Sequence, residues 1–67
     1  MKMKGSIQRY FWSKGYGFID AEDGHSYFFH ISNVDIPEGQ FPKIGQGVTF
    51  ELVENYKGNE AVGVKIV

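Results

Sequence analysis

The stretch that decides the fold is 14–31, KGYGFIDAEDGHSYFFHI. It reads as two short strands joined by an acidic turn that contains Asp-Gly, a strong hairpin signal. Because strand side chains alternate between faces, Tyr16 and Phe18 share one face of the first strand, and Phe28 and His30 share one face of the second. One small hairpin cannot bury all of these rings. We therefore expect an aromatic row that faces solvent and serves a partner.

Alternating apolar residues outside this hairpin predict three further strands. With the two hairpin strands, the expected ranges are 3 to near 12–13, then 16–20, 25–31, 48–53 and 61–66. The segment 32–47 contains both prolines and reads as a long connection with one helical turn near 32–35. Five short strands with a long crossing after the third predict an all-β fold, a five-stranded antiparallel barrel of the OB type.

The composition predicts one small domain, 1–67, whose stability comes from an apolar core. The chain has no cysteine and two histidines, which excludes disulfides and disfavours structural zinc. Its formal net charge of -1 argues against a broad phosphate-neutralising surface. No run approaches the roughly 20 apolar residues of a membrane span, and the opening MKMKGSIQ lacks a signal-peptide core. We expect a cytoplasmic protein without membrane contact.

The aromatic row has two interpretations. As a binding surface, Tyr16, Phe18, Phe28 and His30 would stack unpaired bases, each base contributing roughly 1–3 kcal/mol. As core, the same rings would fill a barrel that is rich in aromatic side chains. The glycines on either side of Tyr16 favour the binding surface. Glycine weakens a strand, so its presence indicates a backbone that something approaches closely.

Two motifs carry a family resemblance. KGYGFI at 14–19 matches the start of the RNA-binding signature K/R-G-F/Y-G/A-F-V, with Ile for Val. This run and YFFHIS at 27–32 resemble the first and second ribonucleoprotein motifs of the cold-shock domain family. The similarity continues through Gly5, GQGVTFE at 45–51 and Gly58, and it covers essentially the whole chain.

This resemblance implies a five-stranded barrel that binds single-stranded RNA and DNA. It also implies a role as an RNA chaperone or as a regulator of transcription or translation. By position, the family's stacking rings fall on Tyr16, Phe18, Phe28 and His30, with Lys14 beside a phosphate.

The chain departs from the family pattern on the flanks of the hairpin. Where the family has Lys-Trp-Phe-Asn before its first motif, this chain has QRYF at 8–11, so Arg9 replaces a stacking Trp. A guanidinium can stack on a base and contact a phosphate, which would retain that site in altered form. Trp12, in the next turn, either supplies the missing ring or covers the barrel end. Ile31 replaces a common aromatic residue at the edge of the row.

Phe41 is the candidate for the loop aromatic that folds over bound bases in the family. It lies beside Pro42 and near Ile44, a couple of positions later than the family ring. It therefore either closes over the bases, which we favour, or plugs the barrel.

The remaining polar residues predict no catalytic or metal chemistry. The acidic turn 20–23 with His25 reads as solvated rather than as a cation site. No nucleophile or orienting acid accompanies His30 at a recognisable spacing, so we expect no enzymatic activity, no cofactor and no metal. Lys57 reads as a solvated residue of the last turn.

The predicted core and partners complete the interpretation. The expected core residues are Ile7, Ile19, Tyr27, Phe29, Val34, Val48, Phe50, Leu52 and Val64. Tyr27 either lies in the core, where its hydroxyl would need a partner, or reaches the barrel rim. The expected partners are single-stranded RNA and DNA, with no small-molecule substrate. The alternative is a protein-interaction barrel that uses the same aromatic face, and the pattern leaves the oligomeric state open.

Overall fold

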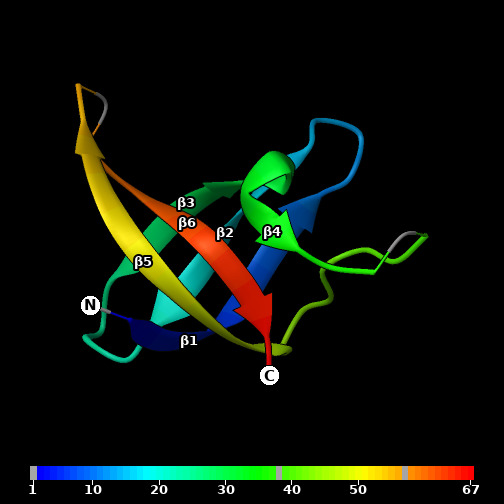
Figure 1. Cartoon of the computed structure of the whole chain (residues 1–67), viewed down its shortest axis with the longest axis horizontal. Helices are drawn as coiled ribbons and strands as arrows, with labels where there is room; N and C mark the ends of the chain where they lie inside the picture. The colour runs from blue at the N-terminus through cyan, green and yellow to red at the C-terminus, as the bar shows by residue number, and fades with distance from the viewer. Residues whose placement is uncertain (1, 38, 57) are drawn as a thin grey trace.

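The computed structural model describes residues 2–37, 39–56 and 58–67. Its elements, in chain order, are β1 (Met3–Phe11), β2 (Tyr16–Ala21), β3 (Ser26–His30), η1 (Ile31–Asn33), β4 (Val34–Asp35), β5 (Gly47–Asn55) and β6 (Gly58–Ile66). The six strands are labelled in Figure 1. η1 is a short 3-10 helix, and the described residues include no helix long and apolar enough to cross a membrane.

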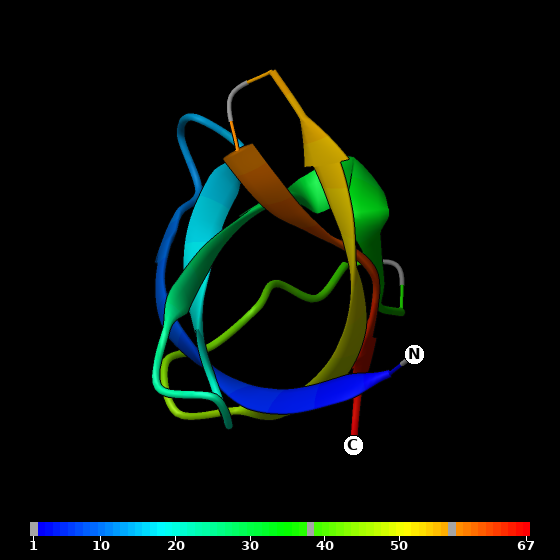
Figure 2. The ribbon, with the colours of Figure 1, turned by 90° about the vertical axis from the view of Figure 1, so that its left-hand side faces the viewer.

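The strands form one sheet in the order β3-β2-β1-β5-β6-β4. The sheet closes because β3 also pairs with β6, through Phe28 with Glu60 and Phe29 with Ala61. Figure 2 shows the ribbon running around the resulting ring. The all-β barrel of OB type is thus confirmed. Its long ladders are antiparallel, whereas the closing pairs of β6 with β3 and β4 are parallel.

The strand bounds agree with the alternation pattern within a few residues. β1 ends at Phe11, slightly before the predicted end near Trp12 and Ser13, while β5 and β6 extend farther into the last hairpin than predicted. β3 ends at His30, one residue early, because Ile31 begins η1. The His30 ring accepts a hydrogen bond from the Ser32 amide and so caps this turn, where the sequence predicts one. Lys57 lies outside the described residues.

Gly5 marks a close backbone crossing. A Cβ there would lie 2.5 Å from the Asp20 carbonyl oxygen and 2.8 Å from Ile19 Cγ2, so no other residue fits. The β-bulge of this strand lies elsewhere in β1. Ile7 pairs with Ile19 and Arg9 pairs with Phe18, which leaves Gln8 as the extra residue.

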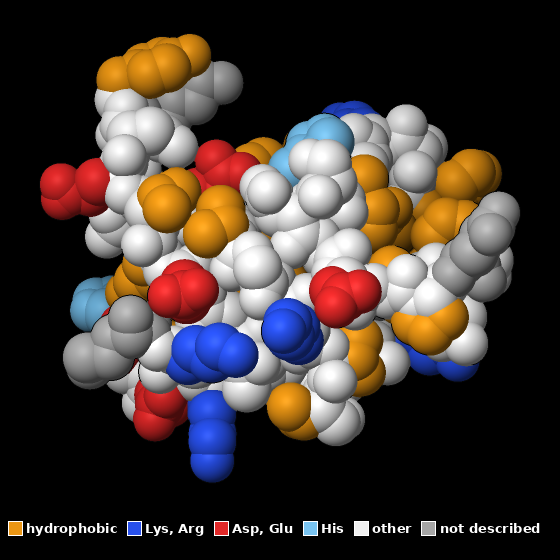
Figure 3. All heavy atoms as spheres, in the orientation of Figure 1, with side chains coloured by type: hydrophobic (Ala, Val, Ile, Leu, Met, Phe, Trp, Pro, Cys, Tyr) orange, Lys and Arg blue, Asp and Glu red, His pale blue; other side chains and the backbone are white. Residues whose placement is uncertain are grey.

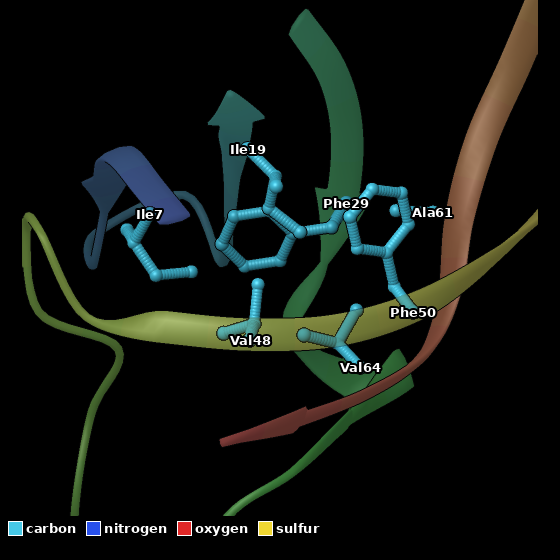
Figure 4. Packing of buried hydrophobic residues seen from close by; sticks show 7 residues of the cluster. All are labelled: Ile7, Ile19, Phe29, Val48, Phe50, Ala61 and Val64. Atoms are coloured by element: carbon cyan, nitrogen blue, oxygen red, sulfur yellow. The ribbon is translucent and has the colours of Figure 1, made fainter. Parts of the chain in front are cut away.

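The core fills the barrel and comes from β1, β2, β3, β5 and β6. Its fully buried members are Ile7, Ile19, Phe29, Val48, Phe50, Ala61 and Val64, whose packing is shown in Figure 4. Three predicted core residues, Tyr27, Val34 and Leu52, are only partly buried against this cluster, and Ala61 was not predicted. Tyr27 lies at the rim because its hydroxyl donates a hydrogen bond to Asp23.

Candidate nucleic-acid interface

Strand register brings the predicted aromatic residues together on the outer face of β2 and β3. Tyr16 pairs with His30, and Phe18 pairs with Phe28. Residues directly opposite each other in an antiparallel pair project to the same face. The intervening residue Phe29 is fully buried, so these four side chains, which we call the platform, lie on the solvent side of the sheet.

The platform rings contact one another without being covered. The ring centroids of Tyr16 and Phe28 are 5.4 Å apart, those of Phe18 and Phe28 are 6.1 Å apart, and those of Tyr16 and Phe18 are 6.4 Å apart. The three rings are half-buried, and His30 is exposed. Mutual packing holds each ring in place while part of its surface stays open to a ligand, which is the arrangement that base stacking needs.

The hydrogen bonds of His30 define which nitrogen of its neutral ring carries the proton. Nδ1 lies 2.9 Å from the Ser32 hydroxyl oxygen and accepts a hydrogen bond from the Ser32 amide at 3.2 Å. In the neutral ring, Nδ1 is therefore an acceptor and Nε2 carries the proton. The platform thus ends on an oriented imidazole with a donor available to a base or a phosphate.

Gly17 allows β1 and the core to approach the platform from below. It is buried, and a Cβ there would collide with the Arg9 carbonyl oxygen and lie 2.9 Å from the Phe29 ring. The close approach predicted from the glycines around Tyr16 is therefore present at Gly17. The atoms that come close to its backbone belong to the protein itself, to β1 and to the core.

The bulge at Gln8 turns Arg9 and Phe11 outward beside the platform. Simple alternation would place both on the inner face with Ile7, but after the bulge Arg9 pairs with Phe18 and Phe11 pairs with Tyr16. The Phe11 and Tyr16 ring centroids are 5.3 Å apart. The Arg9 guanidinium carbon lies over Phe11, 6.0 Å from its ring centroid. Phe11 was not predicted, because its side depends on the bulge.

Trp12 and Lys14 lie in the turn between β1 and β2, and both are exposed. The Trp12 side chain is 76% exposed, and the ring contacts of the described residues do not include it. Of the residues that follow the bulge, Phe11 therefore lies closer to the platform rings than the predicted Trp12 does. Lys14 supplies a cation at this end of the surface.

Phe41 contacts Tyr10 rather than a platform ring. Its ring centroid is 6.4 Å from that of Tyr10, which in turn is 6.2 Å from Phe29 in the core. Phe41 is nevertheless 57% exposed. The ring thus lies over the barrel end in this structure and keeps a large open surface.

The opposite end of the platform is polar. Asp20 Oδ1 accepts hydrogen bonds from the Gln8 side-chain amide and from the Ser26 hydroxyl, both at 2.9 Å. Asp20 pairs with Ser26 in the sheet, next to the Phe18–Phe28 pair. The surface therefore has the Asp20 carboxylate at one end and the cationic groups of Arg9 and Lys14 toward the other. Its electrostatic potential changes from negative to positive along the row of rings.

The acidic turn is held together by Asp23. Its carboxylate accepts hydrogen bonds from the Tyr27 hydroxyl at 2.5 Å and from the His25 amide at 2.9 Å. The hydrogen bond from Tyr27 is the main cause that lowers the pKa of Asp23, and the bond from the His25 amide lowers it further. The same hydrogen bond to Asp23 raises the pKa of Tyr27. Among the described residues, no group of three or more His, Cys, Asp or Glu is placed to hold a metal ion.

A cleft of about 300 Å³ lies beside Phe28, where β5 and β6 leave the barrel as a hairpin. Its lining residues are Phe28, Asn55, Gly58, Asn59 and Glu60. The Glu60 carboxylate accepts hydrogen bonds from the side-chain amides of Asn33 and Asn55. The sequence pattern did not indicate this cleft, because the β3–β6 pairing that forms one wall is a tertiary contact.

The face over β5 and β6 differs from the platform. Lys4, Thr49 and Lys65 lie in one row across β1, β5 and β6. In Figure 3, which views this side of the molecule, basic and acidic side chains are interspersed. The aromatic concentration on β2 and β3 therefore distinguishes the platform face.

The family model described as 'Cold-shock' DNA-binding domain matches residues 3–67. The chain belongs to the cold-shock domain family. The predicted resemblance is thereby confirmed, and this family consists of nucleic-acid-binding domains.

Curated relatives and a solved structure agree with this assignment. A cold shock-like protein of Thermotoga maritima is 38% identical over 65 residues, which cover 97% of this chain and 98% of the relative. The cold shock-like protein CspC of Bacillus cereus is 34% identical, and the match covers 92% of this chain and 95% of the relative. A solved structure described as drosophila Unr CSD456 matches all of this cold-shock domain with a TM-score of 0.82 at 22% identity, and this domain spans 27% of that chain. The last match bears on the fold alone.

Proposed function

We propose that this cold-shock domain binds single-stranded RNA and DNA by stacking unpaired bases on Tyr16, Phe18, Phe28 and His30, without catalysing a reaction. The observation that carries the proposal is the contiguous, half-open ring surface on β2 and β3. A planar ring accepts any base, so binding would tolerate many sequences. Duplexes offer few free base faces, so unpaired strands are the preferred ligand.

The charges of the surface fit a stacking mode. With a formal net charge of -1, the domain has no large excess of cations to drive phosphate binding. Arg9 and Lys14 provide local positive charge, and Asp20 would repel a phosphate at the other end. A bound strand would therefore place its bases on the rings and its phosphates toward Arg9 and Lys14.

A role in RNA remodelling follows from such binding. A domain that transiently covers unpaired bases lowers the free energy of single strands relative to base-paired ones, and it needs no ATP. We propose that the protein acts in the cytoplasm as an RNA chaperone or as a regulator of transcription or translation.

The test is a titration with a short oligothymidylate at low salt, followed by Trp12 fluorescence and by NMR shifts of the platform residues. The same oligothymidylate annealed to its complementary oligoadenylate, a blunt duplex with every base paired, is the matched control. We expect saturable binding of the single strand and much weaker binding of the duplex. Absence of binding by both probes would refute the proposal and would favour a peptide or protein ligand for the aromatic face.

A further inference from the structure

We infer that Phe11, with Arg9, forms an additional base-stacking position that extends the platform toward the turn between β1 and β2. This inference rests on the proposed function. The ligand is one further nucleotide of the same single strand. The first observation is the bulge at Gln8, which gives Arg9 and Phe11 the same outward direction as Phe18 and Tyr16.

Ring spacing makes Phe11 continuous with the platform. The steps from Phe11 to Tyr16 and from Tyr16 to Phe28 are 5.3 and 5.4 Å between ring centroids. The two steps are thus equal within 0.1 Å, and both lie in the range of packed aromatic pairs. Like the platform rings, Phe11 is half-buried. A strand that follows the rings from Phe28 to Tyr16 therefore meets Phe11 next.

The backbone fixes Phe11 in place before any ligand binds. Its carbonyl oxygen accepts hydrogen bonds from the Lys14 amide at 2.9 Å and from the Gly15 amide at 2.8 Å. Gly15 has a φ of 75°, which permits this tight turn. A ring held by its backbone and by Tyr16 loses little conformational freedom on binding.

Arg9 supplies the charge for this position. Its guanidinium carbon, 6.0 Å from the centre of the Phe11 ring, is at the outer limit of a cation–π contact, so the contact that holds it is weak. The long, exposed side chain can move aside, and its planar head can then stack on the incoming base or pair with its phosphate.

The experiment measures affinity for a series of oligothymidylates that grow by one nucleotide, for the wild type and for Phe11→Leu and Phe11→Tyr. Leu keeps apolar bulk but lacks a π-face, whereas Tyr keeps the ring. We expect Phe11→Leu to bind the longest strands roughly 5- to 150-fold more weakly, the equivalent of one lost base stack, and to reach its affinity plateau one nucleotide earlier. Phe11→Tyr should behave as the wild type.

Phe28→Ala separates this inference from the proposed function. If Phe28→Ala weakens binding and Phe11→Leu leaves affinity and plateau length unchanged, the Phe11 position is refuted while the platform stands. If the wild type binds no strand, the proposed function itself fails. Should Phe11→Leu unfold, the wild type still decides, because a stacked base must shift the Phe11 ring protons upfield during titration. Unshifted Phe11 protons at saturation would overturn the inference.

Discussion

Phe28 and Phe29 are neighbours in β3 that project to opposite sides of the barrel, and replacing each by Ala should produce opposite defects. Phe29 is fully buried, whereas Phe28 is half-buried on the platform. Truncating a buried Phe to Ala costs about 3–5 kcal/mol. At roughly 0.05–0.15 kcal/mol per residue, a domain of this size has about 3–10 kcal/mol in total. Phe29→Ala should therefore remove from about a third to all of the stability of the domain.

For Phe28→Ala the structure predicts a modest loss of stability and a large loss of binding. The variant loses ring contacts with Tyr16 and Phe18, each worth about 0.5–1.5 kcal/mol at most because the rings are half-exposed. The Tm should fall by about 4–8 °C for each kcal/mol lost. Affinity for an oligothymidylate should fall by about 1–3 kcal/mol, the contribution of one base stack.

Thermal unfolding by circular dichroism and binding by fluorescence anisotropy measure the two effects separately. Phe29→Ala provides the matched control, since the same atoms are removed one residue away. The reasoning is refuted if Phe28→Ala unfolds as readily as Phe29→Ala, which would make Phe28 a core residue. It is equally refuted if folded Phe28→Ala binds with unchanged affinity.

Four further predictions concern the platform and its surroundings. Gly17→Ala should lower the free energy of unfolding by about 3 kcal/mol or more, because its Cβ would collide with the Arg9 carbonyl oxygen, a backbone atom, and with the Phe29 ring; an unchanged urea midpoint would contradict this. Folding lowers the pKa of Asp23, so the ionised carboxylate stabilises the fold at any pH above the pKa that Asp23 has in the unfolded chain. This stabilisation is lost as the pH falls through the folded-state pKa. Asp23→Asn should therefore flatten the acid limb of a profile of Tm against pH. Folding raises the pKa of Tyr27, so the neutral hydroxyl stabilises the fold at any pH below the pKa that Tyr27 has in the unfolded chain, and this stabilisation is lost as the pH rises through the folded-state pKa. Tyr27→Phe should therefore flatten the alkaline limb of the same profile. Unaltered limbs in both variants would show that the Asp23–Tyr27 hydrogen bond does not contribute to stability. Finally, log affinity against log salt should have a slope of about one to three in magnitude, and a much steeper slope would reveal a basic surface beyond Arg9 and Lys14.

The sequence was sufficient for the parts of the site that depend on alternation within one hairpin. Phe18 and Phe28 were assigned outward, and Ile19 and Phe29 inward, because the side-chain period of a strand is two and the turn fixes the register. The structure shows these directions. Their role in binding remains a prediction.

What depends on contacts between distant segments could not be predicted. The bulge at Gln8 reverses the direction of every later residue in β1, and so Phe11 was overlooked. Phe41 meets Tyr10 because a long connection folds over the barrel end, and alternation contains no information about such a path. The cleft beside Phe28 exists only where β3 and β6 close the barrel.

The closure of the barrel couples nucleic-acid binding to the stability of the pairing between β3 and β6. Phe28 is at once a platform ring and a residue of the seam between β3 and β6, where it pairs with Glu60. If a strand bound on the platform holds Phe28 in its closed position, binding stabilises the seam, and opening of the seam becomes rarer. Bound nucleic acid would then protect the amides of Phe29 and Ala61 from hydrogen exchange, although neither side chain touches solvent.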